Sequence, residues 1–181
     1  MNHGGTLSFR SDVLVEYLAP TNAQTGAFID SGTCTAYVFH DRKDTTLAVA
    51  ALSSDTVLAV ADARKWVIGD QAYVLLETNA WFDAGAVTAV DADANTLTVT
   101  NGLSADVRKG RPVRAILGDP VSMTAFGTPA AGTREWGFRG VLPDTQDDLE
   151  LGMAIRIEID LDAGDGLHVV EVLHATVTDG S

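Results

Sequence analysis

Cysteine, basic residues and long apolar runs are scarce in this chain of 181 residues, and each shortage excludes a class of protein. The single cysteine, Cys34, cannot form an intrachain disulfide, so we expect no disulfide framework and a buried thiol in a reducing cytoplasm. The longest apolar run, at 46–52, is far shorter than the roughly 20 residues that cross a bilayer. The N-terminus lacks a basic start followed by an apolar stretch. We therefore expect neither a membrane span nor an export signal.

Lysine and arginine number 12 against 25 acidic residues, which gives a formal net charge of -13. The basic residues are scattered, apart from "RKGR" at 108–111. A surface of this charge repels phosphate backbones, so we expect no sequence-specific nucleic-acid partner. An acidic wall past which DNA slides without binding is compatible with the same composition.

The sequence also lacks a recognisable catalytic or metal-binding pattern. Its histidines are not spaced as zinc ligands, and one cysteine cannot complete such a site. There is no G-x-S-x-G nucleophile motif, and the glycine-rich "GTPAAGTREWG" lacks the lysine and following helix of a phosphate-binding loop. We expect no enzyme activity, no cofactor and no metal. The histidines are His3, His40, His168 and His174.

Two aspartate-rich segments, "DADANT" and "DLDAGDG", superficially resemble calcium loops. Neither has the twelve-residue span and closing glutamate of an EF-hand, and tight turns use the same residues. We interpret both as turns. If a calcium ion were bound, Asp160, Asp162 and Asp165 would be the candidate ligands.

Short runs rich in valine, isoleucine, threonine and aromatics recur about every ten residues, separated by glycine, aspartate and asparagine. This pattern is typical of an all-β sandwich or barrel. The threonines of "TLTVT" fall on one face and Leu97 and Val99 on the other, as in a half-buried strand. The predicted strands are 13–18, 33–39, 47–52, 57–60, 72–77, 85–90, 96–100, 112–117, 122–126, 135–141, 155–160 and 169–178.

Strand and turn lengths divide the chain into two domains. Residues 61–117 carry closely spaced strands and predict a small β-barrel, whereas the flanks carry longer strands and predict a β-sandwich. We therefore predict a discontinuous sandwich domain, 1–60 plus 118–181, with the barrel inserted. The predicted hinges are 60–65 and 117–120, and glycine and proline interrupt the strand pattern in the second of them. The polar segments 1–11 and 20–32 can build little core, so we expect them to become ordered against partners.

Aromatic residues are the remaining candidates for a binding surface. Trp81 and Phe82 are adjacent at an apparent turn, so at least one should be exposed or at an interface. Trp136 and Phe138 alternate on a strand and point the same way, which fits either core packing or an interface. These four residues are the predicted interface positions.

Two segments resemble structural proteins of tailed bacteriophages. In 66–116, the "IGD" entry, the "VTAVD" strand and the "TLTVTNGL" strand are similar to small β-barrel modules of those proteins. The segment 136–172, with "WGFRG", "LP", an acidic turn and a long paired strand, resembles the second half of phage immunoglobulin-like domains. Together the segments cover about two thirds of the chain, and neither carries a catalytic residue.

The resemblance implies a virion component made in the host cytoplasm. Head-to-tail connector or stopper proteins of the neck are compact β-proteins of this size that form rings. Expected partners are further copies of the chain and a portal or adaptor, a tail terminator, a tail tube or the capsid. A capsid decoration, minor tail or baseplate protein remains the alternative, with a carbohydrate-binding role in which Trp81, Phe82 or Trp136 stacks on sugar rings.

Overall fold

The part of the chain that the computed structural model describes contains twelve β-strands, joined by turns and loops, and no helix. That part comprises residues 3–8, 13–21, 25–131, 133, 135–142, 152–163 and 168–178. The predicted all-β class is therefore confirmed for these residues. Within them, no helix is long and apolar enough to cross a membrane.

The chain divides into two compact units, which are described separately below. The first unit combines Met1–Val38 with Gly118–Ser181, and the second unit is Phe39–Leu117. Strand β3 (Thr33–Thr46) passes from the first unit into the second. This division differs from the predicted one at its N-terminal boundary, because Leu47, Leu58 and Val60 belong to the core of the second unit.

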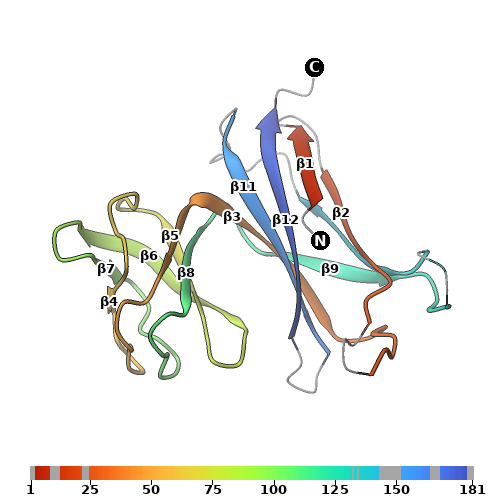
Figure 1. Ribbon diagram of the computed structural model, residues 1–181, viewed down its shortest axis with the longest axis horizontal. Coiled ribbons are helices and arrows are strands. Elements are labelled where there is room, and N and C mark those ends of the chain that lie inside the picture. Colours follow the sequence, from red (N-terminus) through yellow and green to blue (C-terminus); the bar gives the residue numbers. More distant parts are fainter. Residues whose placement is uncertain are drawn as a thin grey trace. The chain divides into compact units, whose positions relative to one another are not determined.

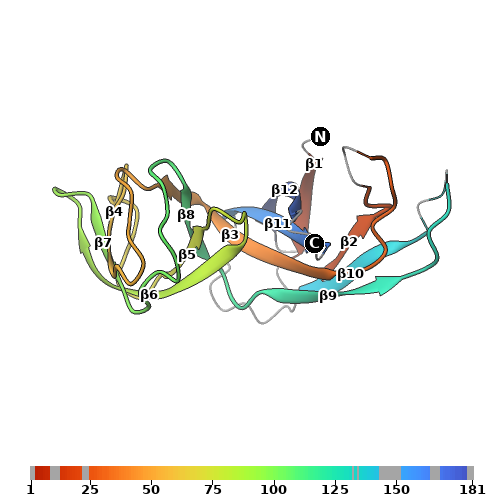
Figure 2. The ribbon, with the colours of Figure 1, turned by 90° about the horizontal axis from the view of Figure 1, so that it is seen from below.

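The first unit contains one continuous path of hydrogen-bonded strands, in the order β1-β12-β11-β3-β9-β10-β2. The pairs β3–β9, β9–β10, β2–β10 and β11–β12 are antiparallel, and β1–β12 is parallel. In Figure 2, β1 and β12 lie on one side of the unit and β9 and β10 on the other. The bounds are β1 His3–Ser8, β2 Val13–Leu18, β9 Val121–Phe126, β10 Gly137–Leu142, β11 Ala154–Asp162 and β12 His168–Thr178.

The core of the first unit follows from the period-two alternation of its strands. On β3, alternate side chains point inward and are buried, while their neighbours are partly exposed. On β11 both faces are covered, so Glu158 and Asp160 are buried as well, and Arg156 lies 2.7 Å from the Glu158 carboxylate. The principal core side chains are Val15, Tyr17, Cys34, Ala36, Val38, Met123, Trp136, Phe138, Ile155, Ile157, Ile159 and Leu161.

The second unit contains the last part of β3 followed, in sheet order, by β8, β5, β6, β7 and β4 (Figure 1). A single bridge between Leu47 and Val60 then joins the segment after β3 to the segment after β4. Hydrogen bonds from Ala48 N to Ala59 O and from Ala61 N to Thr46 O, both 2.8 Å, flank that bridge. The bounds are β4 Val57–Ala59, β5 Gln71–Leu75, β6 Trp81–Asp91, β7 Thr96–Val99 and β8 Pro112–Ile116.

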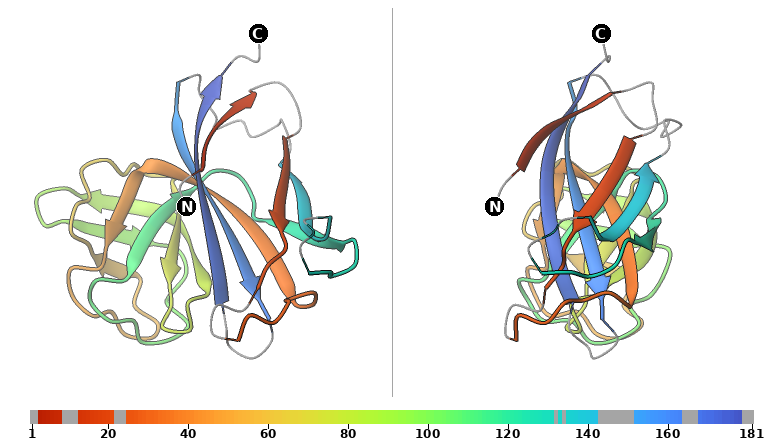
Figure 3. Two further views of the ribbon diagram at one scale, coloured as in Figure 1. Left: turned by 45° about the vertical axis from the view of Figure 1, so that its right-hand side comes forward. Right: turned by 90° about the vertical axis from the view of Figure 1, so that its right-hand side faces the viewer.

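The second unit runs from orange through yellow to green in Figure 3 (left). Buried side chains of its strands and loops form its core. The turn after β6 is the one predicted from "DADAN": the Asp91 carboxylate accepts the N–H groups of Asp93 and Ala94, and Asn95 has a φ of 53°. The core comprises Leu47, Ala51, Leu58, Val60, Ala63, Trp66, Ala72, Val74, Ala84, Val87, Leu97, Val99, Leu103, Val107, Val113 and Ala115.

Four local predictions were wrong, and one of them is the end of β3, which lies at Thr46 instead of residue 39. Residues 47–52 form no strand and make only two isolated bridges, Leu47 to Val60 and Ala51 to Val107. At their end, the N–H groups of Leu52 and Ser53 bind the carboxylates of Asp55 and Asp106. Strand β6 begins at Trp81, four residues before the predicted strand at 85. The fourth error lies near the N-terminus, where no strand was predicted before residue 13 but residues 3–8 form one.

The segments 1–11 and 20–32 were expected to become ordered against partners. Parts of both are ordered by contacts within the chain. Strand β1 pairs in parallel with β12 over its whole length. In the second segment, Thr21 bridges Phe28, the Ile29 N–H donates to the Pro20 carbonyl, and Ile29 is buried. Residues 1–2, 9–11 and 22–24 of these segments lie outside the described residues.

Candidate interaction site

Trp81 lies in an aromatic cluster of the second unit rather than at a turn. It starts β6, is only 8% exposed, and packs on Phe39 with ring centroids 4.7 Å apart. The Arg114 guanidinium lies 5.0 Å from the Trp81 ring centroid and 3.2 Å from the Asp44 carboxylate. The turn itself comes earlier, at Asn79, whose φ is 66°. Trp81 therefore stabilises the core of this unit.

Phe82 points to the other side of β6 and packs half-buried against the main core of the second unit. It pairs in register with Val74 on β5, and Trp81 pairs with Leu75. The predicted opposition of these two neighbouring rings is therefore observed. Both rings nevertheless have cover from their own chain.

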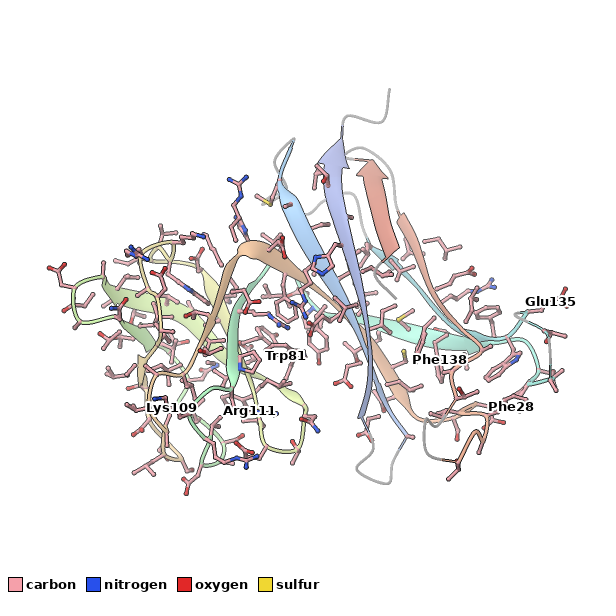
Figure 4. The ribbon with its side chains drawn as sticks, in the orientation of Figure 1. Phe28, Trp81, Lys109, Arg111, Glu135 and Phe138 are labelled. Carbon is pink, nitrogen blue, oxygen red and sulfur yellow. The ribbon has the colours of Figure 1, made fainter. Side chains whose placement is uncertain are left out.

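Trp136 and Phe138 are both buried in the first unit, at 1% and 2% exposure. The rings of Phe28 and Trp136 pack edge to face, with their centroids 5.2 Å apart. Phe28 is 43% exposed and lies at the same end of the unit as Glu135 (Figure 4). The Trp136 indole N–H is buried and has no hydrogen-bond partner among the described residues. The rings of Trp136 and Phe138 fill the core of the first unit, so neither of these two rings offers an open face to a ligand.

An apolar outer surface on β2 and β10 was missed by the sequence reasoning. Leu14 and Val141 oppose each other in register and are 55% and 47% exposed, and Leu18 on the same face of β2 is 37% exposed. Between them Arg139 contacts Glu16 at 3.2 Å and lies 3.7 Å from the Phe126 ring centroid. The signal was present in "VLVEYL", which has apolar residues on both faces of one strand.

The one basic stretch, 108–111, stabilises a turn of its own unit. Arg108 forms an ion pair with Glu77, and these hydrogen bonds lower the pKa of the Glu77 carboxyl. Arg111 donates to the carbonyl groups of Leu75 and Leu76 and to the Asn79 side chain. Figure 4 labels Lys109 and Arg111 of this stretch in the second unit. Two of the three cations of this stretch therefore already have partners within the chain.

The described residues contain no group of three or more histidine, cysteine, aspartate or glutamate side chains that could hold a metal ion. Of the three aspartates named as calcium candidates, Asp160 is buried on β11 and Asp162 ends that strand. Asp165 lies outside the described residues.

Cys34 is buried on β3, and its thiol donates to the Met123 sulfur at 3.6 Å. Loss of hydration, together with the nearby charge of Asp160, raises the pKa of this thiol from 9.0 to about 12. The same two causes raise the pKa of the Tyr37 hydroxyl from 10.0 to about 12. Both groups are therefore neutral in the folded chain at physiological pH.

We expect Cys34 to resist a bulky thiol reagent at pH 8 until denaturant is added. Its folded pKa exceeds its unfolded pKa, so its contribution to stability is complete below pH 9 and is lost between pH 9 and 12. The melting temperature should fall across that window, and Cys34→Ala should make the fall shallower. Rapid labelling of the folded protein, or an alkaline fall unchanged in Cys34→Ala, would contradict this placement.

Comparison of the chain with protein-family models, with curated proteins and with solved structures gave no match.

Proposed function

We propose that the chain is a structural component of a tailed-bacteriophage virion, a stopper-like head-to-tail connector of the neck that assembles as a ring. The observation that carries the proposal is the exposed apolar surface of Leu14, Leu18 and Val141 on the last strand pair of a sheet. Exposed apolar surface beside a sheet edge is typical of a contact between proteins. The resemblance of 66–116 and 136–172 to phage structural modules supplies the biological setting.

We also propose a specific β-fold for each unit. The second unit would be a small closed barrel, supported by the strand path from β3 to β4 and its return through the Leu47–Val60 bridge. The first unit would be an immunoglobulin-like sandwich, supported by the inward faces of β3 and β11. Such rigid β-modules can hold neighbouring proteins at fixed positions without any chemical step.

Charge favours assembly on a template over assembly in free solution. At a net charge of -13, free copies repel one another, whereas a preformed ring can align and concentrate them. We therefore propose that the chain is made in the host cytoplasm as a monomer or weak oligomer and forms a closed array in the virion. Portal or adaptor, tail terminator, tail tube and capsid proteins are the candidate neighbours.

The alternative is a decoration, minor tail or baseplate protein that binds carbohydrate. The buried rings of Trp81 and Trp136 and the half-buried ring of Phe82 weigh against it, because stacking on a sugar requires an open ring face. No other described feature favours sugar binding over protein contact.

Deletion of the gene from the phage tests the proposal. We expect particles to assemble incompletely, with heads that fail to join tails, and infectivity to return when the chain is supplied from a plasmid. Electron microscopy of the lysate gives the measurement. Complete, fully infectious particles without the chain would end the structural proposal, whereas joined particles lacking surface or baseplate density would move the chain to the alternative location.

A further inference from the structure

Among the described residues, the sheet of the first unit ends at each side in a strand with one partner. Its strand order begins at β1 and finishes at β2, and in the described part of the chain each of these strands has a partner on one side only. Both strands have six residues. An open strand edge presents unpaired N–H and C=O groups that can pair with another chain.

The hydrogen-bond pattern identifies which main-chain groups of β2 face outward. Ala19 N donates to Trp136 O at 3.0 Å, which continues the β2–β10 ladder by one pair. In an antiparallel ladder, hydrogen-bonded pairs alternate with non-bonded pairs. Counting back from Ala19, the odd-numbered residues of β2 bond to β10, and Leu14, Glu16 and Leu18 direct their N–H and C=O groups away from it.

Neither strand contains the residue types that usually prevent edge pairing. Proteins protect free edges with lysine, proline or clustered charge, but β1 ("HGGTLS") and β2 ("VLVEYL") contain no lysine, arginine or proline. Their one acidic residue, Glu16, is paired with Arg139 at 3.2 Å. In a chain of net charge -13, these edges are places where two copies can meet with little repulsion.

We propose that copies of the chain extend one another's sheet head to tail, with the β2 edge of one copy paired to the β1 edge of the next. This inference rests on the proposed ring assembly. The occupant is an identical copy because each chain supplies one edge of each kind, equal in length. A contact between two different surfaces can repeat until a ring closes. The neighbour's strand would also lie beside Leu14 and Leu18 and cover part of their exposed surface.

Glu16→Pro tests the β2 edge, with Glu16→Ala as its matched control. Both changes remove the ion pair with Arg139, but only proline removes the outward N–H, and proline is tolerated on an edge strand at such a position. The variants are supplied to the deletion phage, and their copies per purified particle are measured by quantitative mass spectrometry. We expect Glu16→Pro to fall roughly tenfold or more below Glu16→Ala. Equal incorporation of the two would overturn the proposal.

A second pair of variants applies if the proline variant does not fold, as judged by circular dichroism. Leu14→Lys adds a charge beside the same edge, and Val57→Lys adds one at a position of similar exposure in the second unit, 56% against 55%. We expect reduced incorporation for Leu14→Lys alone. Equal incorporation of these two variants would overturn the proposal in the same way.

Mixing Glu16→Pro, or Leu14→Lys if the proline variant does not fold, with the wild-type chain tests the head-to-tail arrangement. The blocked copy still offers a normal β1 edge, so it should join a growing ring, stop it, and lower the yield of infectious particles at equal expression. If β2 instead paired with itself or with another protein, the blocked copy would be left out and the yield would not change. Failure of the wild-type chain to enter particles would be a different result, because it would contradict the proposed function itself.

Discussion

Replacing Trp136 with alanine is expected to lower the free energy of unfolding by about 3–5 kcal/mol, the usual cost of deleting a buried tryptophan side chain. The ring is 1% exposed and meets Phe28 edge to face at 5.2 Å. Its removal would leave a cavity in the core of the first unit. Denaturant unfolding followed by circular dichroism gives the measurement.

Trp136→Phe is the matched control for this prediction. Phenylalanine keeps an aromatic ring and removes an indole N–H that has no partner among the described residues. Burying such a group costs about 1–3 kcal/mol, which offsets part of the cavity cost, so the loss should be much smaller than for alanine. The other two tryptophans, Trp66 and Trp81, belong to the second unit and still report its unfolding by fluorescence. A loss of less than about 1 kcal/mol in Trp136→Ala would contradict the placement of this ring.

Gly85→Ala is expected to destabilise the second unit by about 2–5 kcal/mol. About 1–2 kcal/mol comes from the left-handed backbone, because φ at Gly85 is 80°. About 1–3 kcal/mol more comes from steric overlap, because a Cβ atom would lie 2.0 Å from Thr100 Oγ1 and 2.9 Å from Asn101 Nδ2. Gly85 pairs with Ala72, directly beside the register shift between β5 and β6.

Gly110→Ala separates these two costs. Its φ is 87°, but a Cβ atom there would meet nothing within 4 Å. It should therefore show the backbone cost alone, and the difference between the two variants measures the overlap at Gly85. Thermal and denaturant unfolding of both variants give the comparison. Equal losses in the two would mean that β6 and the Thr100 segment are not as close as described.

Local alternation made most strands predictable. Cys34, Ala36 and Val38 alternate with partly exposed neighbours, and Leu97 and Val99 do the same on β7. A period of two is a property of a few consecutive residues, so it can be recognised without knowledge of the partner strand. Turn chemistry was equally local, since the Asp91 carboxylate binds its own turn.

Features that depend on distant residues could not be predicted in this way. Strand β1 exists because "HGGTLS" pairs with β12 near the other end of the sequence. Strand β3 is longer than predicted because its polar second half, after Phe39, belongs to the second unit and pairs there with β8. In both cases the partner supplies order to a segment whose own composition indicates none.

The exposure of the predicted interface residues also depends on residues that are distant in the sequence. The apparent turn at Trp81 and Phe82 suggested that at least one of these rings is exposed or at an interface. The Asn79 turn ends before Trp81, and the rings of Phe39 and Tyr73 belong to the same aromatic cluster. The exposed surface on β2 depends on which strand lies at the end of the sheet, and among the described strands β2 pairs only with β10. Alternation alone does not reveal strand order.

The presence of the chain in purified infectious particles is the most direct test of the account. Particles are purified by density gradient, and the chain is quantified by mass spectrometry against a labelled standard of known amount. We predict several copies per particle, in a fixed ratio to the portal protein across preparations. A chain that is abundant in the lysate but missing from the particles would contradict the account.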